Sequence, residues 1–241
     1  MDGSDERPHA ASPEGQSDLE LEAVHARIRV CTLCGLHASR TQAVPGSGPV
    51  PADVMIVGEA PGFNEDVQGL PFVGAAGRLL DTLLEQIGLS RQQVFITNIL
   101  KCRPPQNRDP MPTEAESCMP YLRHQFRLIR PKAVLVLGRH ALERMLPGVG
   151  SISRVHGEFF MRGGVAFMPC YHPAAALHNG GLLNDLQRDF DRVRSYLDRL
   201  LPAPEPVSTA PAEPIPPGGG QTPAAETEAA AADPTEQLTL L

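Results

Sequence analysis

Apolar and polar positions alternate with two different periods along the central part of the chain. Short, continuous apolar runs are typical of buried strands, and three of them occur, at residues 54–57, 94–99 and 133–137. Amphipathic stretches with the period of a helix alternate with these runs, at residues 76–88, 113–130, 139–146 and 182–201. Two further short β-like runs are expected within residues 158–169 around a Gly-Gly pair.

Strands that alternate with helices predict an α/β fold with a parallel sheet and helices on both of its faces. In such folds the ligand binds at the carboxyl ends of the strands. Polar segments follow the predicted strands at residues 58–62, 97–98 and 170–173. Each segment alone is typical of turn chemistry, but their common position at one sheet edge indicates a site.

The two ends of the chain lack this periodicity. Residues 1–17 show no apolar pattern, and residues 202–241 are rich in Pro, Ala, Glu and Thr. Segments of this kind cannot bury enough apolar surface to offset the entropy of ordering them. The sequence therefore predicts one domain over residues 18–201, between two disordered acidic tails.

The charge distribution changes what the formal net charge of -7 implies. Residues 1–20 and 202–241 hold twelve of the 28 acidic residues and one base, so residues 21–201 carry a net charge of +4. Arginine, a good planar ligand for phosphate, supplies most of these bases, so a nucleic-acid partner is not excluded. No apolar run approaches the ~18–20 residues of a membrane span, and the acidic N-terminus does not resemble a signal peptide.

Four of the five cysteines are spaced as metal ligands. Cys31 and Cys34 form a C-x2-C pair, and Cys102 and Cys118 follow in a second segment. Four thiolates suit either tetrahedral zinc or an iron–sulfur cluster, and the spacing alone does not choose between them. Scattered buried thiols are the alternative, and this is the expected state of Cys170.

Several segments, in order along the chain, resemble the family 4 uracil-DNA glycosylases. They are Gly58-Glu59-Ala60-Pro61-Gly62, Glu65-Asp66, Gly69-x-Pro71-Phe72-Val73-Gly74, Thr97-Asn98-Ile99-x-Lys101-Cys102-Arg103-Pro104-Pro105 and His172-Pro173-Ala174. The resemblance covers roughly residues 20–200 and includes all four cysteine positions. It implies a three-layer α/β/α sandwich with a central four-stranded parallel sheet. It also implies a [4Fe-4S] cluster on the four cysteines and removal of uracil from DNA by cleavage of the N-glycosidic bond.

The resemblance also assigns roles within the site. Uracil has to leave the base stack to be reached, so a pocket has to replace both stacking and pairing. Phe72 would stack on the flipped base, and the amide of Asn98 would pair with uracil O4 and N3–H. His172, with backbone amides near Glu59 and Ala60, would stabilise the negative charge that develops at uracil O2.

The group that orients the attacking water is left open. Several related families carry an aspartate where this chain has Ala60, so no carboxylate is available at that position. Glu65 and Glu59 are the candidates. Glu65 has two alternatives: it could exclude thymine by walling off the C5 side of the base, or be a solvated loop acid.

Other residues are expected to contact DNA outside the base. Leu177 lies in the segment that resembles the minor-groove loop of the superfamily, and it is the candidate wedge for the space left by the flipped base. Candidates for phosphate contact are Lys101, Arg103, Arg108 and Arg154, although each is as readily explained as a solvated charge.

The C-terminus carries a separate signal. The sequence Gln237-Leu238-Thr239-Leu240-Leu241 follows a long polar segment and resembles the peptide with which bacterial repair proteins bind the sliding clamp. Gln237 would occupy a small polar site, and Leu238, Leu240 and Leu241 would fill an apolar groove. A flexible tether of this kind would hold the enzyme near the clamp.

Two other readings compete with a hydrolytic glycosylase. A uracil-DNA crosslinking relative would need an inserted basic loop with a nucleophilic histidine, and residues 99–112 contain no such insertion. A non-DNA iron–sulfur α/β protein fits poorly with the arginine-rich central part and the ordered motifs. The sequence therefore predicts a monomeric DNA-repair enzyme of the bacterial cytoplasm, associated with the nucleoid and with no membrane partner.

Overall fold

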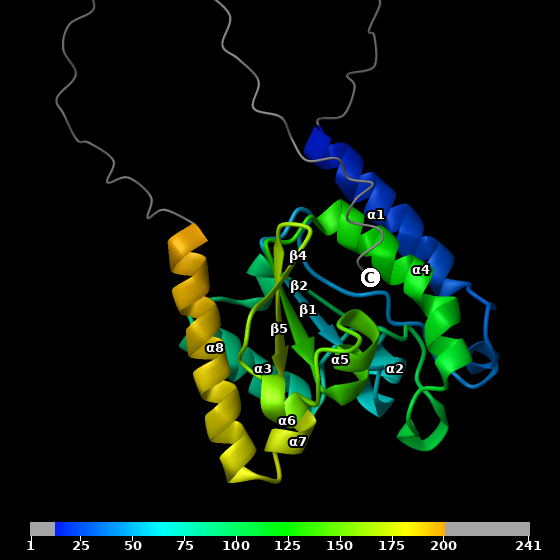
Figure 1. Ribbon diagram of the computed structural model, residues 1–241. Helices are drawn as coiled ribbons and strands as arrows, with labels where there is room; N and C mark the ends of the chain where they lie inside the picture. The colour runs from blue at the N-terminus through cyan, green and yellow to red at the C-terminus, as the bar shows by residue number, and fades with distance from the viewer. Residues whose placement is uncertain (1–12, 201–241) are drawn as a thin grey trace, which may run out of the picture.

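The central sheet has five strands in the order β2-β1-β3-β5-β4. The structure, a computed structural model, describes residues 13–200 (Figure 1). The strands are β1 (Val54–Gly58), β2 (Val94–Asn98), β3 (Ala133–Leu137), β4 (Phe160–Arg162) and β5 (Val165–Cys170). Strands β2, β1, β3 and β5 are parallel, as predicted, and the short β4 pairs antiparallel with β5 at the edge. The predicted four-stranded parallel sheet is confirmed, with one additional hairpin strand.

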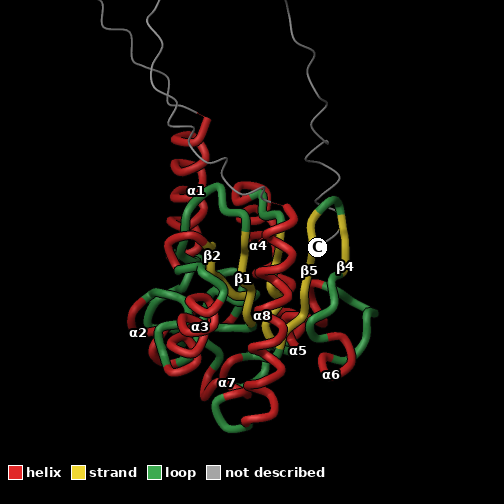
Figure 2. The backbone as a smooth tube through the Cα atoms, turned by 90° about the vertical axis from the view of Figure 1, so that its left-hand side faces the viewer, coloured by secondary structure: helices red, strands yellow, loops and turns green. Residues whose placement is uncertain are grey.

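Helices cover both faces of this sheet, which confirms the three-layer α/β/α prediction. The helices are α1 (Pro13–Arg29), α2 (Phe63–Gln68), α3 (Ala75–Gln86), α4 (Pro112–Ile129), α5 (Arg139–Met145), α6 (Ile152–Val155), α7 (Pro173–Ala176) and α8 (Gly180–Leu200). One apolar cluster joins α1, α4 and α5 to the sheet, and a second joins α3 and α8 to its other face. Figures 1 and 2 show α8 on the opposite side of the sheet from α1 and α4.

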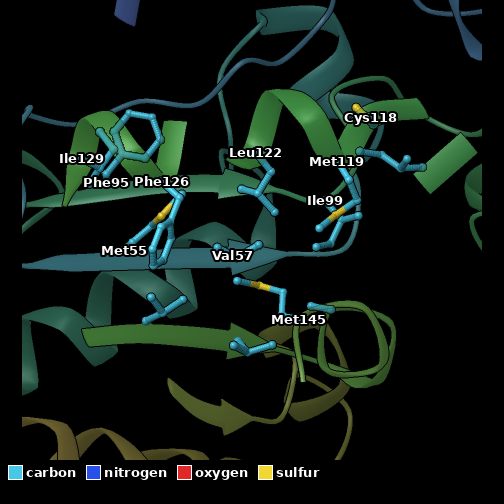
Figure 3. Packing of buried hydrophobic residues seen from close by; sticks show 14 of the residues in the cluster. Met55, Val57, Phe95, Ile99, Cys118, Met119, Leu122, Phe126, Ile129 and Met145 are labelled. Atoms are coloured by element: carbon cyan, nitrogen blue, oxygen red, sulfur yellow. The ribbon is translucent and has the colours of Figure 1, made fainter. Parts of the chain in front are cut away.

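Strand β1 shows how the sequence produces these two clusters. All five of its residues are buried, because side chains alternate between two covered faces. Met55 and Val57 belong to the α4 side, where Figure 3 shows them beside Leu122 and Phe126. Ile56 belongs to the α3 and α8 side. The continuous apolar runs in the sequence therefore mark strands that are buried on both faces.

Helix α1 is the largest element that the periodicity did not predict. It begins at Pro13, inside the segment 1–17 that the sequence predicted to be disordered. Leu21, Val24 and Ile28 form its narrow buried stripe, while most of its other positions are polar. A stripe this narrow is a weak signal in sequence, and packing against α4 stabilises the helix. Residues 1–12 and 201–241, which include the predicted clamp peptide, lie outside the described residues.

The parallel strands end together at one edge of the sheet. Gly58 at the end of β1 is the register partner of Asn98 at the end of β2. The last residues of β1, β2 and β5 and the loops after β1 and β5 carry the three polar segments that the sequence singled out, so topology brings them together. Among residues 13–200, no helix is both long enough and apolar enough to cross a bilayer.

Candidate functional site

A cavity of about 310 Å³ opens at this carboxyl edge of the sheet. It is lined by Glu59, Ala60, Pro61, Gly62, Glu65, Phe72, Ala76, Asn98, Pro104, Asn107, Arg108, His172 and Ala174. The structure thus brings together six of the seven predicted catalytic and substrate-binding residues. The seventh, Leu177, follows α7 outside this lining and is 43% exposed.

Asn98 presents an unpaired acceptor to the cavity. The residue is 2% exposed, and its Oδ1 atom has no hydrogen-bond partner within the described part of the chain. The absence of a side chain at Gly58 creates the space in front of it, since a Cβ there would collide with both Asn98 Oδ1 and the ring of Phe72. Buried acceptors are seldom left unpaired, so this atom is suited to receive an N–H from a ligand.

Phe72 is held in a left-handed backbone conformation, with φ of 53°. Its ring stacks near that of His172, with 5.6 Å between the ring centroids. The guanidinium of Arg91 donates to the carbonyl oxygens of Phe72 and of Pro71, the latter at 3.1 Å. Gly77 allows the Phe72 carbonyl to approach closely, because a Cβ there would overlap it. An uncommon conformation of this kind persists where its surroundings fix it, and Arg91 is a main support.

Glu65 connects the two loops that form one wall of the cavity. Its Oε1 accepts from the backbone N–H of Val73 and of Gly74, both at 2.9 Å, and its Oε2 accepts from that of Gly62 at 3.1 Å. Three of the carboxylate's roughly four acceptor positions are therefore occupied. The structure gives Glu65 a positioning role that sequence reasoning missed, and its role toward water stays a prediction.

His172 is fixed in orientation and in protonation. The backbone N–H of Ala174 donates to His172 Nδ1 at 3.2 Å, so the proton of the neutral ring resides on Nε2. Burial lowers the pKa of His172 to about 4. Near neutral pH the ring is therefore an uncharged hydrogen-bond donor.

Glu59 has neighbours that sequence reasoning did not identify. Its Oε2 lies 3.9 Å from His140 Nε2, which lies 3.3 Å from Asp109 Oδ2. Arg139 donates to the same Asp109 oxygen at 2.8 Å. Burial raises the pKa of Glu59, while His140 opposes that effect. The signal available in the sequence was the position of His140 three residues after the end of β3, at the same sheet edge.

Lys101 does not contact phosphate, and that prediction is wrong. The residue is 1% exposed. Its ammonium group donates to the Asn98 carbonyl oxygen at 2.8 Å, to Gln125 Oε1 at 2.7 Å and to Thr97 Oγ1. Burial lowers the pKa of Lys101 to about 7, and a buried amino group needs such partners; through them it anchors the end of β2 at Asn98. Lys101 is therefore a support of the site from inside the protein.

The other three residues proposed to contact phosphate differ in their exposure and in the partners that they already have. Arg108 lines the cavity but donates through both terminal nitrogens to Glu114, at 2.9 and 2.5 Å. Arg154, after the start of α6, is exposed. Arg103 is half-buried and lies over the ring of Phe63. Arg154 and Arg103 thus stay candidates, whereas Arg108 is committed to an internal ion pair.

The four spaced cysteines line a single small pocket between the end of α1, the loop after β2 and α4. Cys102 and Cys118 are buried, and Cys31 and Cys34 are partly exposed. Arg40 donates to Cys102 Sγ at 3.0 Å. Burial raises the pKa of Cys102 and raises that of Cys118 to about 11. Cys170 lies apart, buried in the other core cluster, as predicted.

Comparisons with known proteins agree with this geometry. Residues 45–198 match the uracil DNA glycosylase superfamily. The type-4 uracil-DNA glycosylase of Sulfurisphaera tokodaii is 46% identical over 72% of this chain and 83% of its own length. Those of Archaeoglobus fulgidus and Thermotoga maritima are 44% and 39% identical, over 76% and 74% of this chain and 96% and 95% of their own lengths. The chain therefore belongs to the uracil-DNA glycosylase superfamily.

Proposed function

We propose that this protein is a DNA-repair glycosylase that flips uracil out of DNA and hydrolyses its N-glycosidic bond, leaving an abasic site. The observation that carries the proposal is the buried, unpaired Oδ1 of Asn98 in a cavity beside Phe72 and His172. The type-4 glycosylases to which the chain is similar give the same activity by name.

Asn98 and Phe72 account for recognition of the base. The Oδ1 atom accepts the N3–H of uracil, and the amide nitrogen donates to O4. Cytosine has the opposite arrangement of donor and acceptor at these positions, so it would leave buried groups unpaired at a cost of about 1–3 kcal/mol each. Phe72 replaces part of the stacking that the base loses when it leaves the duplex.

His172 accounts for departure of the base. When the bond between the sugar C1′ and uracil N1 breaks, its electron pair stays with the uracil ring and the charge gathers at O2. The Nε2–H of neutral His172 donates a hydrogen bond to that oxygen, together with backbone amides near Glu59 and Ala60. Donation without transfer of the proton is favoured, because an imidazole with a pKa of about 4 carries no additional proton at neutral pH.

The second half of the reaction needs a water molecule at C1′. Water adds its oxygen to the cationic sugar carbon and gives up a proton, first to a nearby carboxylate and finally to the uracil anion. Of the two candidate acids, Glu59 is better suited to accept the proton of this water, because three backbone N–H groups already donate to the carboxylate of Glu65. Leu177, exposed just beyond His172, would fill the gap left in the stack.

Release of free uracil from a uracil-containing oligonucleotide tests the proposal. Asn98→Ala and His172→Ala should lose most of the activity, while Met161→Ala, an exposed residue on β4, should retain it. No release by the unaltered protein, or release unaffected by both site variants, would refute the assignment. A stable covalent DNA adduct without free uracil would favour the crosslinking alternative.

The four cysteines are proposed to hold a [4Fe-4S] cluster. A single zinc ion at Zn–S of about 2.3 Å would bring four sulfurs to about 3.8 Å from one another. Within residues 13–200, no three of these thiols lie within 4.8 Å of one another, so they are not drawn together as tightly as the ligands of a single zinc ion. When bound, the cluster supplies a structural cross-link between α1 and the loop after β2. Iron and sulfide content of the purified protein, with Cys118→Ala for comparison, tests this; a colourless zinc protein would contradict it.

The terminal peptide is proposed to bind a bacterial sliding clamp through Gln237, Leu238, Leu240 and Leu241. The chain would act as a monomer in the cytoplasm, near the nucleoid. Deletion of residues 236–241 should abolish binding to the clamp and leave uracil release from short duplexes unchanged. Unchanged clamp binding would reject the motif.

A further inference from the structure

Phe63 is an exposed aromatic residue next in the chain to the lining of the cavity. It is the first residue of α2, directly after Gly62, which lines the cavity. Although a phenylalanine, it is 61% exposed. Aromatic rings are usually buried, so an exposed one beside a binding cavity is informative.

Arg103 is arranged against this ring. Its guanidinium carbon lies 5.1 Å from the centroid of Phe63, within the range of a cation–π interaction. Its Nε donates to Asn107 Oδ1 at 2.7 Å, and Asn107 itself lines the cavity. The pair is therefore continuous with the wall of the base pocket and consists of an aromatic surface and a cation.

The loop that orients this pair adopts an uncommon backbone conformation. Gln106 and Asn107 both have a φ of 55°, in the left-handed region that few residues other than glycine adopt. Such conformations cluster at functional sites, where the surroundings fix them. Here the conformation accompanies the bond from Arg103 to Asn107, which holds the guanidinium over Phe63.

We propose that Phe63 and Arg103 form a stacking site for the nucleotide next to the flipped uracil. This inference rests on the proposed glycosylase function and adds a second binding position to it. The neighbouring base would stack on the exposed surface of the Phe63 ring, and Arg103 would face the phosphate between the two nucleotides. Stacking of bases on aromatic rings beside a cationic group is the recognition chemistry of single-stranded nucleic acid.

The chemistry of the pair favours a nucleotide over another occupant. Gly62 and Pro104 line the cavity and are the chain neighbours of Phe63 and Arg103, so the pair is next to the position of the flipped base. The cation matches the charge of the phosphate, and the ring matches the flat face of any base. The site would therefore bind without sequence preference, which suits an enzyme that meets uracil in any context.

Fluorescence of 2-aminopurine tests the stacking directly. The probe is a single-stranded oligonucleotide in which 2-aminopurine neighbours a 2′-fluorinated deoxyuridine, whose glycosidic bond resists cleavage because fluorine destabilises positive charge on the sugar. Two such oligonucleotides carry 2-aminopurine on the 5′ or the 3′ side. We expect the full-length protein to quench one of them, and Phe63→Ala to lose that quenching while Phe63→Tyr retains it.

Steady-state kinetics on the unmodified oligonucleotide provide the second measurement. Phe63→Ala should raise KM by roughly 5- to 150-fold, the loss associated with one base–aromatic stack, with kcat unchanged. Met161→Ala is the matched control, because Met161 is 57% exposed and lies on β4, away from the cavity. Unaltered quenching and KM in Phe63→Ala would overturn the inference, as would an equal rise of KM in Met161→Ala.

The two proposals fail in different ways. If the unaltered protein releases no uracil, the glycosylase function fails, whatever the fluorescence shows. If it releases uracil but quenches neither probe, only the stacking site fails. A concentration-dependent dimer that disappears in Phe63→Ala, with quenching intact, would assign Phe63 to self-association and overturn the nucleotide site.

Discussion

Gly58→Ala is the smallest change that should close the base pocket. Gly58 is the last residue of the buried strand β1, and its register partner is Asn98. A methyl group at this position would lie 2.7 Å from the Cζ atom of Phe72 and closer still to Asn98 Oδ1. Both neighbours belong to the wall that we propose receives uracil.

The size of the effect follows from these separations. Ordinary contacts of a Cβ atom begin at 3.4 Å, so the Phe72 ring has to move by about 0.7 Å and the Asn98 amide by more. Misplacement of about 1 Å in a reacting site costs on the order of 100-fold in rate. The overpacking itself costs about 1–3 kcal/mol of the free energy of unfolding, which a domain of this size can tolerate.

Single-turnover uracil release and thermal unfolding measure the two effects separately. We expect kcat/KM of Gly58→Ala to fall by about 100-fold, while the protein still unfolds in one cooperative transition. Gly180→Ala is the control, because a Cβ there would meet no atom within 4 Å. A folded Gly58→Ala protein with kcat/KM within threefold of the unaltered protein would show that the pocket is not where the base binds.

Three further predictions follow from the same site. Asn98→Leu should lower kcat/KM for uracil by at least about 30-fold, yet leave Tm unchanged or higher, because it removes an unpaired buried acceptor; a lower Tm would contradict this. The free energy of unfolding should decrease as pH falls from about 6.5 to about 4, because the unfolded chain takes up protons that His172 and His25, each with a pKa lowered to about 4 by burial, resist. His172→Asn should remove its own part of that slope in urea titrations and leave the part due to His25. Arg91→Gln should cost about 1–2 kcal/mol and lower kcat/KM more than Asp81→Asn does, because Arg91 supports the Phe72 carbonyl directly; equal losses would refute that role.

The sequence predicted the sheet and its functional edge well, for a physical reason. Strands buried on both faces, such as Val54–Gly58, have to be apolar throughout, and that signal is strong in a single sequence. The strand-end rule then located Asn98 and the segment at His172 without any contact information. Helix α1 was not predicted, because only a narrow stripe of its residues is buried and apolar.

The supports of the site could not be predicted from the sequence. Lys101 looks like a phosphate ligand in the sequence, and only the packing of α4 against β2 reveals that it is enclosed. In the sequence, the charge of Glu65 suggests a catalytic role. In the structure, its carboxylate oxygens accept hydrogen bonds from backbone N–H groups three to nine residues away. Which partners a polar side chain finds depends on the tertiary arrangement, and periodicity carries no information about it.

The pairing of Gly58 with Asn98 has a consequence for fidelity. A glycosylase that removed normal bases would damage DNA. A misfolded copy that stayed active but lost its base specificity would therefore be more harmful than an inactive copy. Here Gly58, which leaves room for the base, and Asn98, which would bind it, are register partners on two neighbouring strands. A slip of one residue between these strands would turn Asn98 to the opposite face and remove the pocket altogether. This error of register would therefore give an inactive protein, not one that removes normal bases.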